Sequence, residues 1–296
     1  MSITPNLWFN GNAAEAVGFY TTVFTDSQIT STAHYPEEGL LDFQKELAGQ
    51  ELVVNFELGG VGMTAINAGP EFSFNPSISF LVNFDPAQRD NARTDLDELW
   101  GKLTQDGEVN MPLGEYPFSA HYGRLTDKYG VTWQLILTNP AGDPRPFVIP
   151  YLTFCGANVN RAKEAIDFYT SVFDNSSVGM VAPYEQQSGP AAAGAVMFGE
   201  FALDGQWFAA ADSFGDIDAA FNEAVSFLVP CANQEEIDYY WSKLSTAGPE
   251  FEQCGWCKDE FGVSWQIVPA NMGELMNKPD AYSTLMSMKK IVIDQF

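Results

Sequence analysis

The chain has 296 residues, of which 46% are apolar, and a formal net charge of −25. This length suits two domains of about 150 residues each, and the negative charge excludes nucleic acid and anionic membranes as partners, because binding to phosphates depends on Lys and Arg. No apolar run approaches the roughly 18 residues of a membrane span, and the N-terminal residues lack the pattern of a secretory signal, so we expect a cytoplasmic protein.

The first half of the chain is predicted to contain two modules, each of a strand, a helix and further strands. Helices are expected at residues 12–24 and 91–105, where apolar residues recur on one helix face. The strands are expected at residues 7–9, 28–35, 51–58, 62–67, 77–83, 120–126 and 131–137. Gly59 and Gly60 separate two of these strands and indicate a hairpin.

The second half of the chain repeats the first. Four pairs of similar blocks occur in one order: 3–24 with 148–173, 74–82 with 221–229, 96–108 with 237–250, and 126–137 with 258–269. Recurrence of four blocks in the same order indicates a duplication. Between the halves, residues 139–147 hold three prolines and a glycine and are interpreted as a linker.

We therefore predict an α+β fold of two tandem domains, each made of two βαβββ modules that form a curled, half-open mixed sheet. The predicted segments are a first domain at 1–138, the linker at 139–147, a second domain at 148–271 and a C-terminal helical extension at 272–296. Whether the modules pair within or between the two domains stays open.

Two short motifs have simpler interpretations than the sites they resemble. The glycines of residues 59–62 precede no helix, so a phosphate-binding loop is not expected there. Cys254 and Cys257 have the C-x-x-C spacing of redox and zinc sites. However, the following residues indicate a turn and a strand, whereas a reactive thiol needs a helix N-terminus and zinc needs a second close pair. We interpret the cysteines as structural or incidental.

Paired βαβββ modules, a Phe-Tyr pair near the end of the first helix, and D-x-x-G-x-x-W-Q in the last hairpin resemble the vicinal oxygen chelate superfamily. This superfamily includes glyoxalase I, bleomycin-resistance proteins and extradiol dioxygenases. The segments at 69–75, 221–227, 240–245 and 254–269 resemble its PhnB-like branch, which is labelled 3-demethylubiquinone-9 3-methyltransferase. The resemblance implies a cavity within each curled sheet and a pseudo-dimer within one chain. A further homodimer is left open.

The resemblance also implies where a metal ion would bind. In metal-using relatives the last carboxylate ligand stands four residues after the turn glycine of the final hairpin. The residues at the implied ligand positions are Pro5, Ser77 and Gln134 in the first half and Pro150, Ala224 and Gln266 in the second. A neutral amide is a poor substitute for a carboxylate on a divalent cation, and proline has no ligand atom. We therefore expect no metal cofactor at these positions.

Several side chains are candidates for a ligand site. Each glutamine amide could orient a ligand by hydrogen bonds. Arg124 could bind a carboxylate or phosphate of a ligand, or form an ion pair with a surplus acid. The candidate ligand-binding residues are Gln134, Arg124, Trp8, Tyr122, Gln266, Trp256 and Asp212. His121 is the candidate catalytic base, with a core or surface histidine as the alternative. Trp133 and Trp265 alternate with the glutamines and are predicted to face the other side of the sheet.

Two functions remain open. The first is metal-independent binding of a small aromatic or polar molecule in a sheet cavity. The alternative is a metal- or His121-dependent lyase, isomerase or dioxygenase, so whether the chain is an enzyme is undecided. Methyl transfer has no support from the residues, because no glycine-rich strand-to-helix loop is present and the element order differs from a doubly wound sheet.

Overall fold

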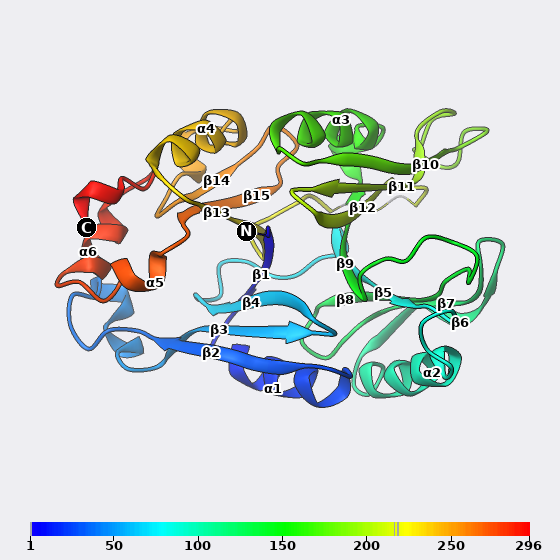
Figure 1. The fold of residues 1–296 in the computed structure, drawn as a ribbon, viewed down its shortest axis with the longest axis horizontal. Coiled ribbons are helices and arrows are strands. Elements are labelled where there is room, and N and C mark those ends of the chain that lie inside the picture. The colour runs from blue at the N-terminus through cyan, green and yellow to red at the C-terminus, as the bar shows by residue number, and fades with distance from the viewer. Residues whose placement is uncertain (1, 216, 218) are drawn as a thin grey trace.

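The computed structural model describes residues 2–215, 217 and 219–296. The chain forms two mixed sheets, which we call sheet A and sheet B (Figure 1). The structure confirms the α+β class and the two curled, open sheets. It also answers the question of which modules pair, because each sheet combines one module from each half of the chain.

Sheet A has seven strands in the order β14-β15-β13-β1-β4-β3-β2. Module 1 supplies β1 (Thr4–Phe9), α1 (Ala13–Val23), β2 (Gln28–His34), β3 (Glu51–Leu58) and β4 (Val61–Asn67). Module 4 supplies β13 (Val225–Cys231), α4 (Gln234–Leu244), β14 (Trp256–Lys258) and β15 (Ser264–Pro269). The two modules join through antiparallel pairing of β1 with β13.

Sheet B has eight strands in the order β10-β11-β12-β9-β5-β8-β7-β6. Module 2 supplies β5 (Ile78–Phe84), α2 (Ala92–Leu103), β6 (Glu108–Tyr116), β7 (Ser119–Thr126) and β8 (Thr132–Leu137). Module 3 supplies β9 (Val148–Phe154), α3 (Ala162–Val172), β10 (Ser177–Pro183), β11 (Val196–Leu203) and β12 (Gln206–Asp212). Here β5 pairs antiparallel with β9.

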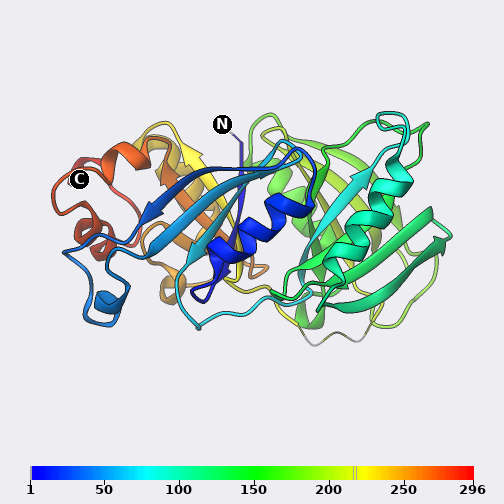
Figure 2. The same ribbon diagram turned by 90° about the horizontal axis from the view of Figure 1, so that it is seen from below.

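The helices α1 to α4 cover one face of each sheet. The helices α1 and α4 contact strands of sheet A, and α2 and α3 contact strands of sheet B. The helices α1 and α2 also contact each other, as Figure 2 shows from below. The main hydrophobic core lies on these helix-bearing faces and is continuous between the two sheets. We call the other face of each sheet its open face.

The turns between strands follow the sequence. Gly59 and Gly60 join β3 to β4 with φ angles of +56° and +79°, which confirms the predicted hairpin, since glycine adopts positive φ without a steric penalty. One strand, β6, was not predicted. It contains Pro112 and Gly114 and pairs with β7 through several register shifts, so it lacks the regular alternation of a strand. The corresponding part of module 4 is a short 3-10 helix at Pro249–Phe251.

The C-terminal segment lies between the two edge strands of sheet A (Figure 1). It contains α5 (Met272–Leu275) and α6 (Ala281–Ser287). Next to β14, the backbone N–H groups of Cys254 and Gly255 donate to carbonyl oxygens of Met288 and Lys289 at 2.8 and 2.7 Å. Near β2, the Tyr282 ring of α6 contacts Tyr35, with ring centroids 6.2 Å apart. The segment therefore connects both edges of sheet A.

Gly255 should be intolerant of a side chain, because a Cβ there would lie 2.9 Å from both Ile267 O and Ile291 Cδ1. Its φ is +87°, while Gly11 has a φ of +81° and open space within 4 Å of the position that a Cβ would take. Both alanine variants carry the left-handed strain of about 1 to 2 kcal/mol. We expect Gly255→Ala to lower the unfolding free energy by about 3 kcal/mol and Gly11→Ala by about 1 kcal/mol, measured by urea unfolding. Equal losses would contradict the close contact.

No helix in the described part of the chain is long and apolar enough to cross a membrane.

Candidate functional site

The repeated D-x-x-G-x-x-W-Q motif divides between the two faces of each sheet. Its aspartate and tryptophan lie in the core on the helix-bearing face. Asp259 accepts hydrogen bonds from Tyr169 Oη at 2.7 Å, Trp265 Nε1 at 2.8 Å and two backbone N–H groups. Asp127 accepts the same set, including Tyr20 Oη and Trp133 Nε1, both at 2.8 Å. The predicted orientation of the two tryptophans is confirmed.

These two aspartates also connect the two sheets. Asp259 follows β14 in sheet A, whereas its partner Tyr169 is on α3, which covers sheet B. Burial raises the pKa of Asp259 to about 6, and the hydrogen bonds that it accepts partly oppose this shift. Burial raises the pKa of Asp127 as well. Most of the shared motif therefore stabilises the duplicated fold.

The glutamine of each motif lies on the open face. Gln134 Nε2 donates to Ser79 Oγ at 2.8 Å, and Gln266 Nε2 donates to Ser226 Oγ at 2.9 Å. In sheet B, Tyr122 Oη also donates to Gln134 Oε1 at 2.6 Å. In both sheets the NH₂ group of the amide therefore faces a serine hydroxyl. A metal ligand would instead have to direct an oxygen lone pair towards the ion.

The prediction that Pro5 and Pro150 occupy a metal-ligand position is wrong. Pro5 pairs with Phe227, and Pro150 pairs with Phe80, which places both prolines on the helix-bearing face. Counting from the Phe-Tyr pair could not determine the face, since a shift of one residue in a strand reverses the side on which each side chain lies. The adjacent residues Asn6 and Tyr151 lie on the open faces.

The open faces therefore define the residues that a metal ion would meet. Near the glutamines, the central strands of the open faces carry Asn6, Thr64 and Ser226 beside Gln266 in sheet A, and Tyr151, Ala209 and Ser79 beside Gln134 in sheet B. Neither set contains an imidazole or a carboxylate, which are the usual protein ligands of divalent ions. Among the described residues, no group of three or more His, Cys, Asp and Glu is placed to hold a metal. The donor set does not fit a divalent cation.

The open face of sheet B combines two arginines with apolar side chains, and one of them, Arg145, is paired with Glu200 at 3.2 Å and lies over the Trp207 ring. Arg124 is the cross-strand neighbour of Gln134 and lies on the same face as Tyr122. Its Nη2 donates to Pro76 O at 3.0 Å, and its Nε is buried without a hydrogen-bond partner in the described chain. No carboxylate of the described residues forms an ion pair with it. The apolar neighbours on this face are Leu81, Ile136, Ile149, Tyr151, Phe198, Trp207 and Ala209.

The two phenols on this face respond to burial and to Arg124. Burial raises the pKa of Tyr122 to about 12, and the positive charge of Arg124 partly opposes the shift. Burial likewise raises the pKa of Tyr151, again against the charge of Arg124. Both side chains are therefore neutral hydrogen-bonding groups at physiological pH.

Aromatic rings extend from this face to the solvent. The Phe118 ring is stacked on Tyr116 at a centroid distance of 5.7 Å and meets the edge of Tyr122 at 5.0 Å. Phe118 is 63% exposed, although it is large and apolar. The ring lies in the turn between β6 and β7, so it stands at the rim of the face that carries Arg124 and Gln134.

The predicted residues of sheet A form a second group. Trp8 and Trp256 contact each other with ring centroids 5.8 Å apart, and Trp256 is the cross-strand neighbour of Gln266. Trp8 Nε1 donates to Gly69 O at 2.8 Å. Trp256 therefore takes the position that Arg124 has in sheet B, and the two open faces differ in charge.

His121 lies on the other face of β7 from Tyr122. Its Nε2 is 2.6 Å from Asp97 Oδ1 of α2, and its Nδ1 is 3.4 Å from Arg93 Nη2. It therefore faces a helix, away from Gln134. A catalytic role for His121 stays a prediction that its position does not support.

Asp212 ends β12 and is also outside both groups. It is 1% exposed and accepts hydrogen bonds from the backbone N–H groups of Ala162 at 3.1 Å and Val196 at 2.8 Å. Burial raises its pKa. Asp212 thus fixes the start of α3 against β11, and its predicted ligand contact stays untested. Tyr151, Ser79 and Phe118 were missed by the sequence prediction, because only strand register shows which face they share with Gln134.

The family model of 3-demethylubiquinone-9 3-methyltransferase matches the chain twice, over residues 1–136 and 147–268. The chain belongs to this family. A Bacillus cereus PhnB protein that carries the same family description is 37% identical over 47% of this chain and all of that chain, with a TM-score of 0.40. The family lies in the vicinal oxygen chelate superfamily, as the sequence predicted.

The whole tandem arrangement also has a structural relative. A glyoxalase I mutant from Zea mays is 12% identical over 91% of this chain and 94% of that chain, with a TM-score of 0.52, which shows a shared fold. A fosfomycin resistance protein from Listeria monocytogenes with Mn(II) is 7% identical over 45% of this chain and 86% of that chain, with a TM-score of 0.29. A search of curated proteins found no match.

Proposed function

We propose that this PhnB-like chain binds a small planar anion, such as an aromatic carboxylate, on the open face of sheet B without a metal ion. The observation that carries the proposal is Arg124, whose guanidinium has no carboxylate partner among the described residues. In a chain with 39 acidic and 14 basic residues, an arginine without such a partner calls for an anion from outside.

The surrounding groups favour a planar ligand with a polar end. Tyr122 and Gln134 offer neutral hydrogen-bonding groups beside Arg124. Phe118 offers an exposed ring for stacking at the rim. Sheet A is the less suitable face, because Trp256 stands in the place of Arg124 and the C-terminal segment connects the edges of that sheet.

Replacing Arg124 by glutamine should weaken binding of the best aromatic carboxylate by about 10- to 100-fold, because a charge-assisted hydrogen bond contributes about 1.5 to 3 kcal/mol. Gln134→Ala should weaken the same binding without unfolding the chain. The probes are benzoate and salicylate, titrated calorimetrically in the presence of EDTA. Gln266→Ala is the matched control, since it removes the equivalent amide from sheet A.

Several results would contradict the proposal. Binding that needs a divalent ion would show that metal-independent recognition is wrong. A loss in Gln266→Ala with no loss in Gln134→Ala would place the site in sheet A. Benzamide binding as tightly as benzoate would show that Arg124 does not select an anion.

A further inference from the structure

On the open face of sheet B, Arg124 is the first residue of a row that crosses several strands. Arg124 is the cross-strand neighbour of Gln134 on β8, and Gln134 is level with Leu81 on β5. Leu81 is level with Ile149 on β9, and the register of β12 with β9 places Trp207 next. Because neighbouring strands are about 4.8 Å apart, the four steps from Arg124 to Trp207 span roughly 19 Å along the curled sheet. A ligand with one ring, such as benzoate, covers only part of this row.

A second arginine lies at the far end of this row. The Arg145 guanidinium is 4.2 Å from the centroid of the Trp207 ring, and Arg145 Nη2 is 3.2 Å from Glu200 Oε2. The side chains of this ion pair are only 18% and 12% exposed. Arg145 belongs to the segment between the two halves of the chain, and Asn83 Nδ2 of β5 donates to Pro146 O of that segment at 2.8 Å. These contacts hold the Arg145 side chain over the far end of the row.

The two arginines each have a buried donor that lacks an acceptor. Arg124 Nε and Arg145 Nε are both buried, and neither has a hydrogen-bond partner in the described chain. A buried N–H group without an acceptor is costly, so an acceptor from outside the chain is favoured at each. The charges of the two sites differ, because Glu200 neutralises Arg145 whereas no described carboxylate pairs with Arg124. A carboxylate therefore fits at Arg124, and a neutral acceptor such as a hydroxyl oxygen fits at Arg145.

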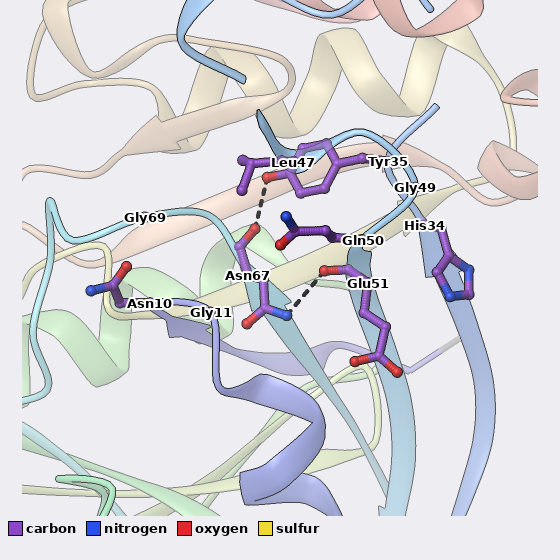
Figure 3. A pocket seen from close by; sticks show the side chains of 10 residues that line it. All are labelled: Asn10, Gly11, His34, Tyr35, Leu47, Gly49, Gln50, Glu51, Asn67 and Gly69. Atoms are coloured by element: carbon purple, nitrogen blue, oxygen red, sulfur yellow. Dashed lines mark hydrogen bonds between the residues drawn. The ribbon is translucent and has the colours of Figure 1, made fainter. Parts of the chain in front are cut away.

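A pocket of about 410 Å³ at the end of sheet A differs from this row (Figure 3). Hydrogen bonds within the protein fix its wall. Tyr35 Oη donates to Asn67 O at 2.7 Å, and Asn67 Nδ2 donates to Glu51 O at 3.0 Å. None of the described residues that line it carries a buried side-chain polar atom without a partner. The pocket therefore presents no buried group that favours a ligand, whereas the sheet B row presents two.

We propose that the ligand of sheet B is an aromatic carboxylate with two rings and a neutral hydrogen-bond acceptor at the end opposite the carboxylate. This inference rests on the anion site proposed above. The carboxylate binds Arg124, the rings pack on the apolar cluster around Leu81 and Ile149, and the second ring contacts Trp207. The terminal acceptor receives the N–H of Arg145 Nε. Arg124 thus selects the charge of the ligand, while Trp207 and Arg145 select its length.

The test is calorimetric titration of the full chain with benzoate, biphenyl-4-carboxylate and 4′-hydroxybiphenyl-4-carboxylate in the presence of EDTA. Affinity should rise about 10-fold with the second ring, which buries more apolar surface, and about 5-fold more with the hydroxyl. Trp207→Ala should lose most of the gain from the second ring and keep its affinity for benzoate, and Trp207→Phe should retain part of that gain. Arg145→Lys keeps the charge beside Glu200 but lacks Nε, so it should lose only the gain from the hydroxyl. The matched control is Trp256→Ala, which removes a tryptophan from the open face of sheet A and should bind all three probes normally.

Equal affinity of the wild-type chain for benzoate and the biphenyl probe would overturn this inference and leave the anion site standing. A gain from the second ring that survives in Trp207→Ala would also overturn it, because the second ring would then lie elsewhere. If Trp207→Ala does not fold, Arg145→Lys decides: a persistent gain from the hydroxyl would contradict the inference, and its loss would support it. If none of the three probes binds, the anion site and this inference are both wrong.

Discussion

Replacing Asp259 by alanine should lower the free energy of unfolding by about 4 kcal/mol, because four buried donors would lose their acceptor and each unsatisfied group costs about 1 to 3 kcal/mol before relaxation. The donors are Tyr169 Oη, Trp265 Nε1 and the backbone N–H groups of Phe261 and Val263. Asp259 itself is 0% exposed, so water cannot replace the lost bonds. Urea unfolding followed by tryptophan fluorescence measures the loss.

Tyr169→Phe is the control for this prediction. It removes one donor and leaves the carboxylate with its other partners, so the expected loss is about 1 kcal/mol. In the Asp259→Ala background the same change should cost almost nothing, because its acceptor is already absent. A loss below about 1 kcal/mol for Asp259→Ala would show that the network contributes little to holding the two sheets together.

Asp259 should also make stability depend on pH. Its pKa is about 6 in the folded chain, against 3.8 for an ordinary aspartate. Between these values the folded chain binds the proton more tightly than the unfolded chain does. The contribution of protonated Asp259 to the free energy of unfolding is therefore fully present below pH about 4 and is lost as the pH rises through about 6. The loss is about 3 kcal/mol, since one pKa unit corresponds to about 1.4 kcal/mol.

The comparison with Asp259→Asn isolates this effect from the other 38 acidic residues, since the chain has 39 in all and asparagine does not titrate. Unfolding free energies of both proteins are measured in urea at intervals from about pH 4 to about pH 8. The difference between wild type and variant should change by about 3 kcal/mol between about pH 4 and about pH 7 and then stay constant. If the difference in unfolding free energy between wild type and variant does not change with pH, the hydrogen bonds from the four donors fully compensate the cost of burying the charged carboxylate.

The duplication explains why one chain keeps two similar motifs with different surroundings. Asp127 and Asp259 are equivalent in the core, where each accepts hydrogen bonds from a buried tyrosine hydroxyl and a buried tryptophan N–H group. The open faces carry no such constraint. Arg124 in sheet B and Trp256 in sheet A occupy equivalent positions beside a glutamine, yet one is cationic and the other is aromatic. The two open faces therefore differ in charge and in the groups that they present beside the glutamine.

The sequence by itself determined the local features of this protein. Strand and helix periodicity predicted most of the elements, and the Gly59-Gly60 hairpin followed from the φ angles that glycine permits. Alternation of side chains along a strand correctly placed Trp133 and Trp265 on the face of the sheet that does not carry the glutamines. The sequence also shows Gln134 and Gln266 directly at the positions where the family resemblance implied a carboxylate ligand, because the identity of a side chain does not depend on the fold.

Only the tertiary structure decided the pairing of modules 1 with 4 and 2 with 3, since four similar modules offer similar edges and the choice depends on contacts far apart in the chain. Strand register, which is set by those contacts, decided that Asn6 and not Pro5 lies on the open face. It likewise turned His121 towards Asp97 and brought Tyr151 onto the face of Gln134. Which side chains share a site is a property of strand pairing, and pairing is a long-range interaction that no short stretch of sequence contains.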